Sequence, residues 1–221
     1  MTKRVIPASM MSGVLGALML AGCSDDSGTE KKVPSKSLQV CAQFLGAENV
    51  RKAVDSVGGG EEAALARHAP GDLAAALTRE AEEWSEGDLL HNAYSACRID
   101  IPAEGGGGGG GAFVIEASVA WSVLMDDLMS EPKYAKTWRR LNDHVFVESG
   151  TGQPIMRLLV ACGVPGAPSG QQAGLPLQMT VIDSGLPVEQ REALLSTFAR
   201  TLVDELACTD NPTVPAQLLS R

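Results

Sequence analysis

The sequence is most strongly constrained by two stretches in which apolar side chains recur at every second position. In residues 93–101, the apolar Cys97, Ile99 and Ile101 alternate with Arg98 and Asp100. In residues 113–121, apolar residues occupy every odd position, and Glu116 and Ser118 lie between them. This period of two is typical of strands that bury one face. Seven consecutive glycines, residues 105–111, separate the stretches. A phosphate-binding glycine loop needs a helix after it, whereas a strand pattern follows here. We therefore predict a hairpin with a loose glycine-rich connection.

Periodicity predicts three further strands and several helices around this hairpin. The strands span residues 144–148, 155–164 and 175–183. The helices span residues 38–57 (one helix, or two that join near Gly46), 61–68, 72–84 with Asp72 as the cap, 131–142 and 187–208. Hairpin-type links between consecutive strands favour an α+β domain: an antiparallel sheet of about five strands with helices packed on one face. We predict a single domain over residues 38–208, followed by a polar tail, residues 209–221.

Residues 1–22 have the features of an export signal. Lys3 and Arg4 precede an uncharged segment, residues 5–22, whose densest apolar part is too short for a membrane span of about 20 residues. The segment ends in the letters LAGC, residues 20–23: one aliphatic residue, two small residues and a cysteine. This pattern resembles the lipobox of bacterial lipoproteins. A chance cysteine after an ordinary signal peptide is the alternative.

The resemblance implies that the thiol of Cys23 carries a diacylglycerol and that residues 1–22 are removed. Two acyl chains would then anchor the protein stably on the extracytoplasmic face of the cell membrane. Residues 23–37 are polar after the cysteine, and we expect them to form a flexible tether. Without residues 1–22 the net charge falls from −9 to −11, so an anionic membrane surface should repel the domain.

The four remaining cysteines indicate disulfide bonds. An even number of cysteines in an exported protein favours disulfides, and Cys41, Cys97, Cys162 and Cys208 allow three pairings. Cys97 and Cys162 lie on the apolar faces of their predicted strands, where a helix would pack. A helix with its own cysteine precedes the first of these strands and another follows the second. We therefore predict the pairs Cys41–Cys97 and Cys162–Cys208, with free buried thiols as the alternative.

No motif in the chain predicts a catalytic residue, a metal ligand or a bound cofactor. His68, His91 and His144 have no metal-site spacing, and no two cysteines have C-x-x-C spacing. The segment from Ser130 to Lys133 matches S-x-x-K, but the motifs that accompany it in serine enzymes are absent. We expect the protein to be a non-enzyme, although a noncontiguous active site remains open.

Two charged clusters are interpreted as solvated helix faces. One is acidic (Glu80, Glu82, Glu83 and Glu86), with a cation site as the alternative, and the other is the basic run 133–140, with a partner contact as the alternative. The acidic balance of the whole chain, with a pI near 4.8, argues against nucleic-acid binding, because phosphate contacts need clustered Lys and Arg.

The layout after residue 37 resembles small secreted actinobacterial lipoproteins of unknown function, in which one cysteine lies near the start of the first helix and another on an early strand, here Cys41 and Cys97. It is similar, more loosely, to the extracellular sensor domains of some mycobacterial kinases. The resemblance transfers no functional residue. We expect a non-enzymatic binding, interaction or sensor module, with an envelope protein or a small ligand as its partner. The alternatives are an envelope hydrolase or transferase that uses His91 or His144, and a solute-binding lipoprotein.

Overall fold

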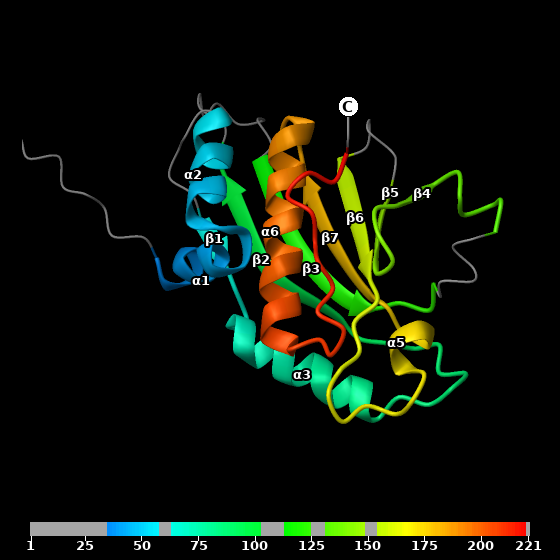
Figure 1. Ribbon diagram of the computed structural model, residues 1–221. Helices are drawn as coiled ribbons and strands as arrows, with labels where there is room; N and C mark the ends of the chain where they lie inside the picture. The colour runs from blue at the N-terminus through cyan, green and yellow to red at the C-terminus, as the bar shows by residue number, and fades with distance from the viewer. Residues whose placement is uncertain (1–34, 58–62, 103–112, 125–130, 149–153, 220–221) are drawn as a thin grey trace, which may run out of the picture. The chain divides into compact units, whose positions relative to one another are not determined.

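The computed structural model describes residues 35–57, 63–102, 113–124, 131–148 and 154–219 (Figure 1). The lipidation site Cys23, most of its tether, the glycine run 105–111 and Ser130 lie outside the described residues, so the statements about them stay predictions. Among the helices that are described, none combines the length and the apolar character needed to cross a membrane.

In the described part of the chain, seven strands form one sheet in which every neighbouring pair is antiparallel. The spatial order is β1-β2-β3-β7-β6-β5-β4. The strands are β1 (Ala63–Leu65), β2 (Ala93–Ile101), β3 (Phe113–Trp121), β4 (Trp138–Arg140), β5 (Val145–Glu148), β6 (Ile155–Val160) and β7 (Leu177–Asp183). The bounds of β2 and β3 are those predicted. The sheet has more strands than the predicted five because two short edge strands, β1 and β4, extend it.

Helices pack on one side of this sheet, as the α+β prediction requires. The described helices are α1 (Lys36–Leu45), α2 (Ala47–Ser56), α3 (Pro70–Glu82), α5 (Gln171–Gly174) and α6 (Val188–Leu206). Of these, α1, α3 and α6 contact strands of the sheet, and α2 packs on α1 and α6. Figure 1 shows α1, α2 and α6 in front of the strands. The helices α1 and α2 join at Gly46, whose φ of +83° lies in the region that favours glycine. Of the two alternatives for residues 38–57, the structure has two helices that join at Gly46.

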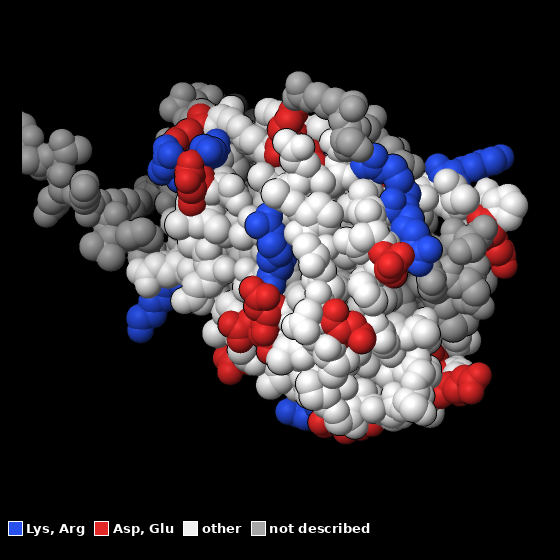
Figure 2. Space-filling view, viewed as in Figure 1, with Lys and Arg blue, Asp and Glu red and all other residues white. Residues whose placement is uncertain are grey.

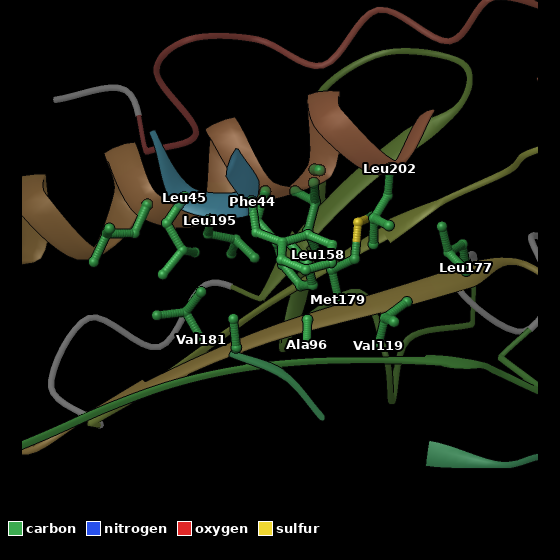
Figure 3. Packing of buried hydrophobic residues seen from close by; sticks show 14 of the residues in the cluster. Phe44, Leu45, Ala96, Val119, Leu158, Leu177, Met179, Val181, Leu195 and Leu202 are labelled. Carbon is green, nitrogen blue, oxygen red and sulfur yellow. The ribbon is translucent and has the colours of Figure 1, made fainter. Parts of the chain in front are cut away.

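The core lies between these helices and the covered face of the sheet (Figure 3). Alternate residues of β3 and β7 are buried, which is the period of two that predicted them. Phe44 of α1 meets Phe198 of α6 edge to face, with ring centroids 5.8 Å apart. A smaller cluster of Trp138, Phe146 and Leu159 is separate from this core.

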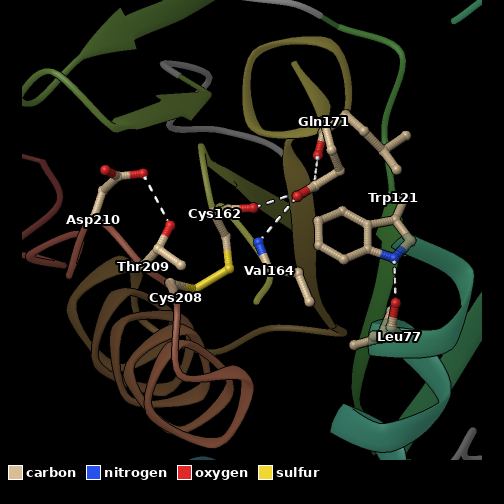
Figure 4. Close-up of a disulfide and its surroundings, with 9 residues drawn as sticks. Leu77, Trp121, Cys162, Val164, Gln171, Cys208, Thr209 and Asp210 are labelled. Carbon is tan, nitrogen blue, oxygen red and sulfur yellow. Dashed lines mark hydrogen bonds between the residues drawn. A yellow bond between two sulfur atoms is a disulfide. The ribbon is translucent and has the colours of Figure 1, made fainter. Parts of the chain in front are cut away.

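Two disulfides fasten helices to the sheet, and their pairing is the predicted one. Cys41 of α1 bonds to Cys97 of β2, and Cys162, just after β6, bonds to Cys208, just after α6 (Figure 4). Partners are 56 and 46 residues apart in the sequence. All four cysteines are buried. Each bond therefore closes a long loop of the chain and removes conformational freedom from the unfolded state.

Two predicted helices are wrong. Within 61–68, residues Ala63–Leu65 form β1, which pairs with β2 from Asp100 to Arg98. A helix of so few residues gains few hydrogen bonds for its costly nucleation, whereas the edge of β2 offers a ready partner. Within 131–142, turns are followed by β4, because Trp138 packs with Phe146 instead of continuing a helix.

The start of α3 also differs from the prediction. Asp72 does not cap the helix, because Pro70 is already its first residue and Asp72 lies within the first turn. Proline suits this position since its fixed φ matches a helix and its missing N–H would have had no helical partner. An acidic side chain in the first turn still interacts favourably with the helix dipole.

The segment after α6 packs against the domain, although its polar sequence predicted a tail. Val214 and Leu218 are buried. The carboxylate of Glu192, itself buried on α6, accepts hydrogen bonds from the backbone N–H groups of Leu218 and Leu219. One turn further along α6, the hydroxyl of Ser196 donates to a backbone carbonyl of the same segment. Two polar residues of the helix thus hold the segment in place.

Replacing both Cys162 and Cys208 with alanine should lower the free energy of unfolding by about 2–4 kcal/mol, because the chain-entropy model gives about 4 kcal/mol for a loop of this length. Urea unfolding of the whole protein measures the change. Adding a reductant to the double variant should have a smaller effect than adding it to the unchanged protein. An unfolding midpoint that does not move in the double variant would contradict this role.

Candidate functional site

Three loops at one end of the domain enclose a hollow of about 820 Å³, which we call the loop-end hollow. Its lining comes from the loop after α3, the turn after β3 and the segment around α5: residues 84–89, Val123, 168–170 and Gly174. The loop after α3 and the segment around α5 lie together at the lower end of Figure 1. A volume of this size is in the usual range for small-molecule sites, about 300–1,000 Å³.

One wall of the hollow, the segment around α5, is fixed by the buried amide of Gln171 (Figure 4). The Oε1 atom of Gln171 accepts a hydrogen bond from the N–H of Val164 at 3.0 Å. Its Nε2 donates to the carbonyls of Cys162 and Leu175, at 3.2 and 3.3 Å. Cys162, whose carbonyl accepts one of these hydrogen bonds, also forms the disulfide with Cys208. A side chain and a covalent bond together therefore hold a segment that has little regular structure of its own.

Trp84 forms part of the floor and rests on the backbone of α5. A Cβ atom added to Gly174 would lie 2.8 Å from Cζ2 of the indole, which is closer than real contacts allow. The absence of a side chain at Gly174 is thus what lets the ring approach. The ring stays half-buried, so it presents an apolar surface within the lining of the hollow.

Exposed apolar side chains occur in the lining of the hollow and next to it in the sequence. Leu89 and Leu90 are 72% and 94% exposed, and Val123 is 38% exposed. Leu89 and Val123 belong to the lining itself. Single exposed leucines are ordinary, but several beside a hollow mark a surface suited to an interaction.

Two carboxylates also line the hollow, those of Glu86 and Asp88. Asp88 accepts hydrogen bonds from the hydroxyl and the backbone N–H of Ser85, at 2.8 and 2.9 Å. These two bonds lower the pKa of Asp88 below its ordinary value and keep the carboxylate charged. No Lys or Arg occurs among the residues that line this hollow. Figure 2 shows acidic side chains along the lower edge of the domain, near α3 and the loop after it.

Behind the loop, Glu80 connects α3 to the start of β2. Its Oε1 lies 3.5 Å from Nδ1 of His91 and accepts a hydrogen bond from the N–H of Asn92 at 2.8 Å. Its Oε2 accepts the hydroxyl of Tyr94 at 3.2 Å. Burial, and then the charge of Glu80, raise the pKa of Tyr94, which keeps the phenol protonated as a donor. The side chain of Glu80 is only 15% exposed, so interpreting it as part of a solvated acidic face was wrong.

One histidine contacts this carboxylate, and a second lies beside the tyrosine that donates to it. His91 contacts Glu80 directly, and the rings of His68 and Tyr94 lie nearly perpendicular, at 82°, with centroids 6.4 Å apart. His91 has a side chain only 7% exposed, and its Nε2 has no hydrogen-bond partner among the described residues.

His144 lies elsewhere and lines a second cavity of about 210 Å³. The helix α5 contributes residues to both linings, Gln172 and Ala173 here and Gly174 in the loop-end hollow. The cavity is lined mainly by apolar side chains, including Phe146 and Leu159, and its polar lining residues are Asp143, His144 and Gln172. Its lining includes no serine or cysteine.

The basic run 133–140 makes several local contacts. The Nζ of Lys133 lies 4.9 Å from the ring centroid of Tyr134, and the guanidinium of Arg140 lies 5.2 Å from that of Phe146. Arg139 donates a hydrogen bond to the carbonyl of Leu218. At least part of this run therefore serves packing within the domain.

Within the described ranges, no three His, Cys, Asp or Glu side chains come together in a way that could hold a metal ion. The arrangement offers instead an apolar hollow with carboxylates and a fixed wall, which is suited to binding. Comparison with protein-family models, curated proteins and solved structures found no match for this chain.

Replacing Gly174 with alanine should displace Trp84, because the new Cβ would overlap the indole ring. We expect a shifted indole N–H resonance for Trp84 and a loss of about 1–3 kcal/mol in the free energy of unfolding. The matched control is Gly71→Ala, where a Cβ would meet only Glu205, at an ordinary 3.5 Å. A Trp84 indole resonance in Gly174→Ala that is unchanged from that of the original protein would rule out the contact.

Replacing Ser85 with alanine should raise the pKa of Asp88 toward its ordinary value, because the hydroxyl bond, the main cause of its lowering, is lost while the backbone bond remains. Since the pKa of Asp88 is lowered by folding, its contribution to stability is present above the ordinary aspartate pKa and is lost as the pH falls through the lowered value. An NMR titration of the Asp88 carboxyl carbon measures the pKa, and urea unfolding at several pH values measures the effect on stability. Ser56→Ala is the control, and equal pKa values in all three proteins would contradict the assignment.

Proposed function

We propose that this chain is a lipid-anchored module on the extracytoplasmic face of the cell membrane that binds a ligand in the loop-end hollow. The lipobox-like LAGC, residues 20–23, supports the anchor on Cys23, and the polar residues 23–37 support a flexible tether. Two buried disulfides suit a protein that works outside the reducing cytoplasm. In this proposal the diacylglycerol supplies attachment, and binding requires neither a cofactor nor catalysis.

The observation that carries the binding role is the loop-end hollow itself. Its floor includes an aromatic ring, its rim has exposed leucine and valine side chains, and its α5 wall is fixed by Gln171 and a disulfide. Apolar linings with a few placed polar groups are the usual composition of ligand sites. A wall that is already ordered also lowers the entropy that binding would cost.

An envelope hydrolase or transferase is the second candidate, and the contact between His91 and Glu80 favours it. A carboxylate beside one imidazole nitrogen is the arrangement that orients a general base. The opposite nitrogen, however, must reach the substrate, and Nε2 of His91 is buried. The contact therefore suits a structural role that joins α3 to β2, and we favour binding over catalysis.

The binding role is tested by native mass spectrometry of the whole protein purified in mild detergent from its own membranes. We expect a bound species whose mass is absent from a Trp84→Ala variant. Trp138→Ala, which changes an indole outside the hollow, is the control and should retain it. A protein without a bound species, or one that retains it in the Trp84 variant, would contradict binding at the hollow.

The anchor is tested separately by replacing Cys23 with alanine. The variant should move from the detergent phase to the aqueous phase in a phase-separation assay, because both acyl chains would be lost. A variant that remains in the detergent phase would exclude the lipid anchor, whatever the result for the hollow.

A further inference from the structure

We infer that the loop-end hollow selects a small organic cation with an apolar body, an inference that rests on the proposed binding function. The inference combines the negative charge of two carboxylates in the lining with the aromatic and aliphatic surface of the other lining residues. Both come from residues that line the same hollow, and neither depends on residues outside the described ranges.

The charged groups of the lining are all negative. Glu86 and Asp88 contribute two carboxylates, and the lining contains no basic side chain to neutralise them. Glu86 has no ion-pair or hydrogen-bond partner for its side chain among the described residues. Asp88 is held in one orientation by Ser85, so its charge is already placed before a ligand arrives. An anion would be repelled here, and a cation would be attracted.

The rest of the lining selects an apolar body. Trp84 is the aromatic residue of the lining, and Leu89, Val123 and Pro168 add aliphatic surface. An indole attracts a cation placed over its face and also packs against an apolar group. A ligand that joins a positive head to an apolar body would therefore use both features at once, whereas an inorganic cation would leave the apolar surface exposed to water.

The size of the hollow favours a small molecule. Its volume of about 820 Å³ falls within the range of sites that enclose most of a small ligand. The carboxylates lie on an exposed loop, so each ion pair is screened by solvent. We therefore expect the charge to contribute selectivity of several-fold and the apolar surface to supply most of the affinity.

The experiment compares three probes that share a phenyl ring and a short chain but differ in their heads: phenethylammonium, 2-phenylethanol and 3-phenylpropionate. Each is titrated into the whole protein in a non-ionic detergent, and Trp84 and Leu89 resonances are followed by NMR. We expect the ammonium to bind about three- to tenfold more tightly than the alcohol, and the carboxylate most weakly. Raising the salt concentration should reduce the advantage of the ammonium, since it screens exposed charges.

In the double variant Glu86→Gln and Asp88→Asn, the affinity for the ammonium should fall to that for the alcohol. The affinity for the alcohol should equal that of the unchanged protein. Asp55→Asn, an exposed carboxylate on α2, is the control and should keep the selectivity. An alcohol that binds as tightly as the ammonium to the unchanged protein would overturn the inferred ligand class but leave the binding function standing. If no probe shifts either resonance and native mass spectrometry finds no bound species, the proposed function fails as well.

Discussion

The pairing of β3 with β7 holds the two halves of the domain together. Strands β1 to β3 follow one another across one half of the sheet, and β7 to β4 complete the other half in reverse order. The pairing runs from Ile115 with Asp183 to Trp121 with Leu177. The helix α1 packs on β2 in the first half, and α6 packs on β6 and β7 in the second. Without this ladder each half would expose a long, half-apolar strand edge.

The same ladder positions the loop-end hollow. At the end of β3, the indole N–H of Trp121 donates to the carbonyl of Leu77 at 3.0 Å and so links the strand to α3 (Figure 4). The next residue, Ser122, donates its N–H to the carbonyl of Pro176 at 2.9 Å, just before β7. The loop after α3, the turn after β3 and the segment around α5 are therefore all connected to one end of the central pair. An open hollow can persist there because bonds to the ends of β3 and β7, together with the Gln171 amide and the Cys162–Cys208 disulfide, hold its walls.

Sequence patterns predicted the parts of the fold that repeat or lie on one face. Alternation predicted β2 and β3, and the position of cysteines on apolar faces predicted both disulfides. The short strands β1 and β4 gave no such signal, because three residues show no period and their structure depends on a neighbouring strand. Ser196 and the buried Glu192 looked like ordinary polar residues of a helix, although they hold the segment after α6.

The hollow was not predictable from sequence because it depends on contacts between distant residues. Trp84 and Gly174 are far apart in the chain, and only the fold shows that the ring needs a glycine beside it.

The central claim is that the ligand binds at this end of the domain, in the loop-end hollow. Photo-crosslinking in cells tests it directly, with a photoreactive residue at Leu90 beside the hollow or at Leu65 on β1, both exposed leucines. We predict an adduct at Leu90 and none at Leu65, and the opposite result would contradict the claim.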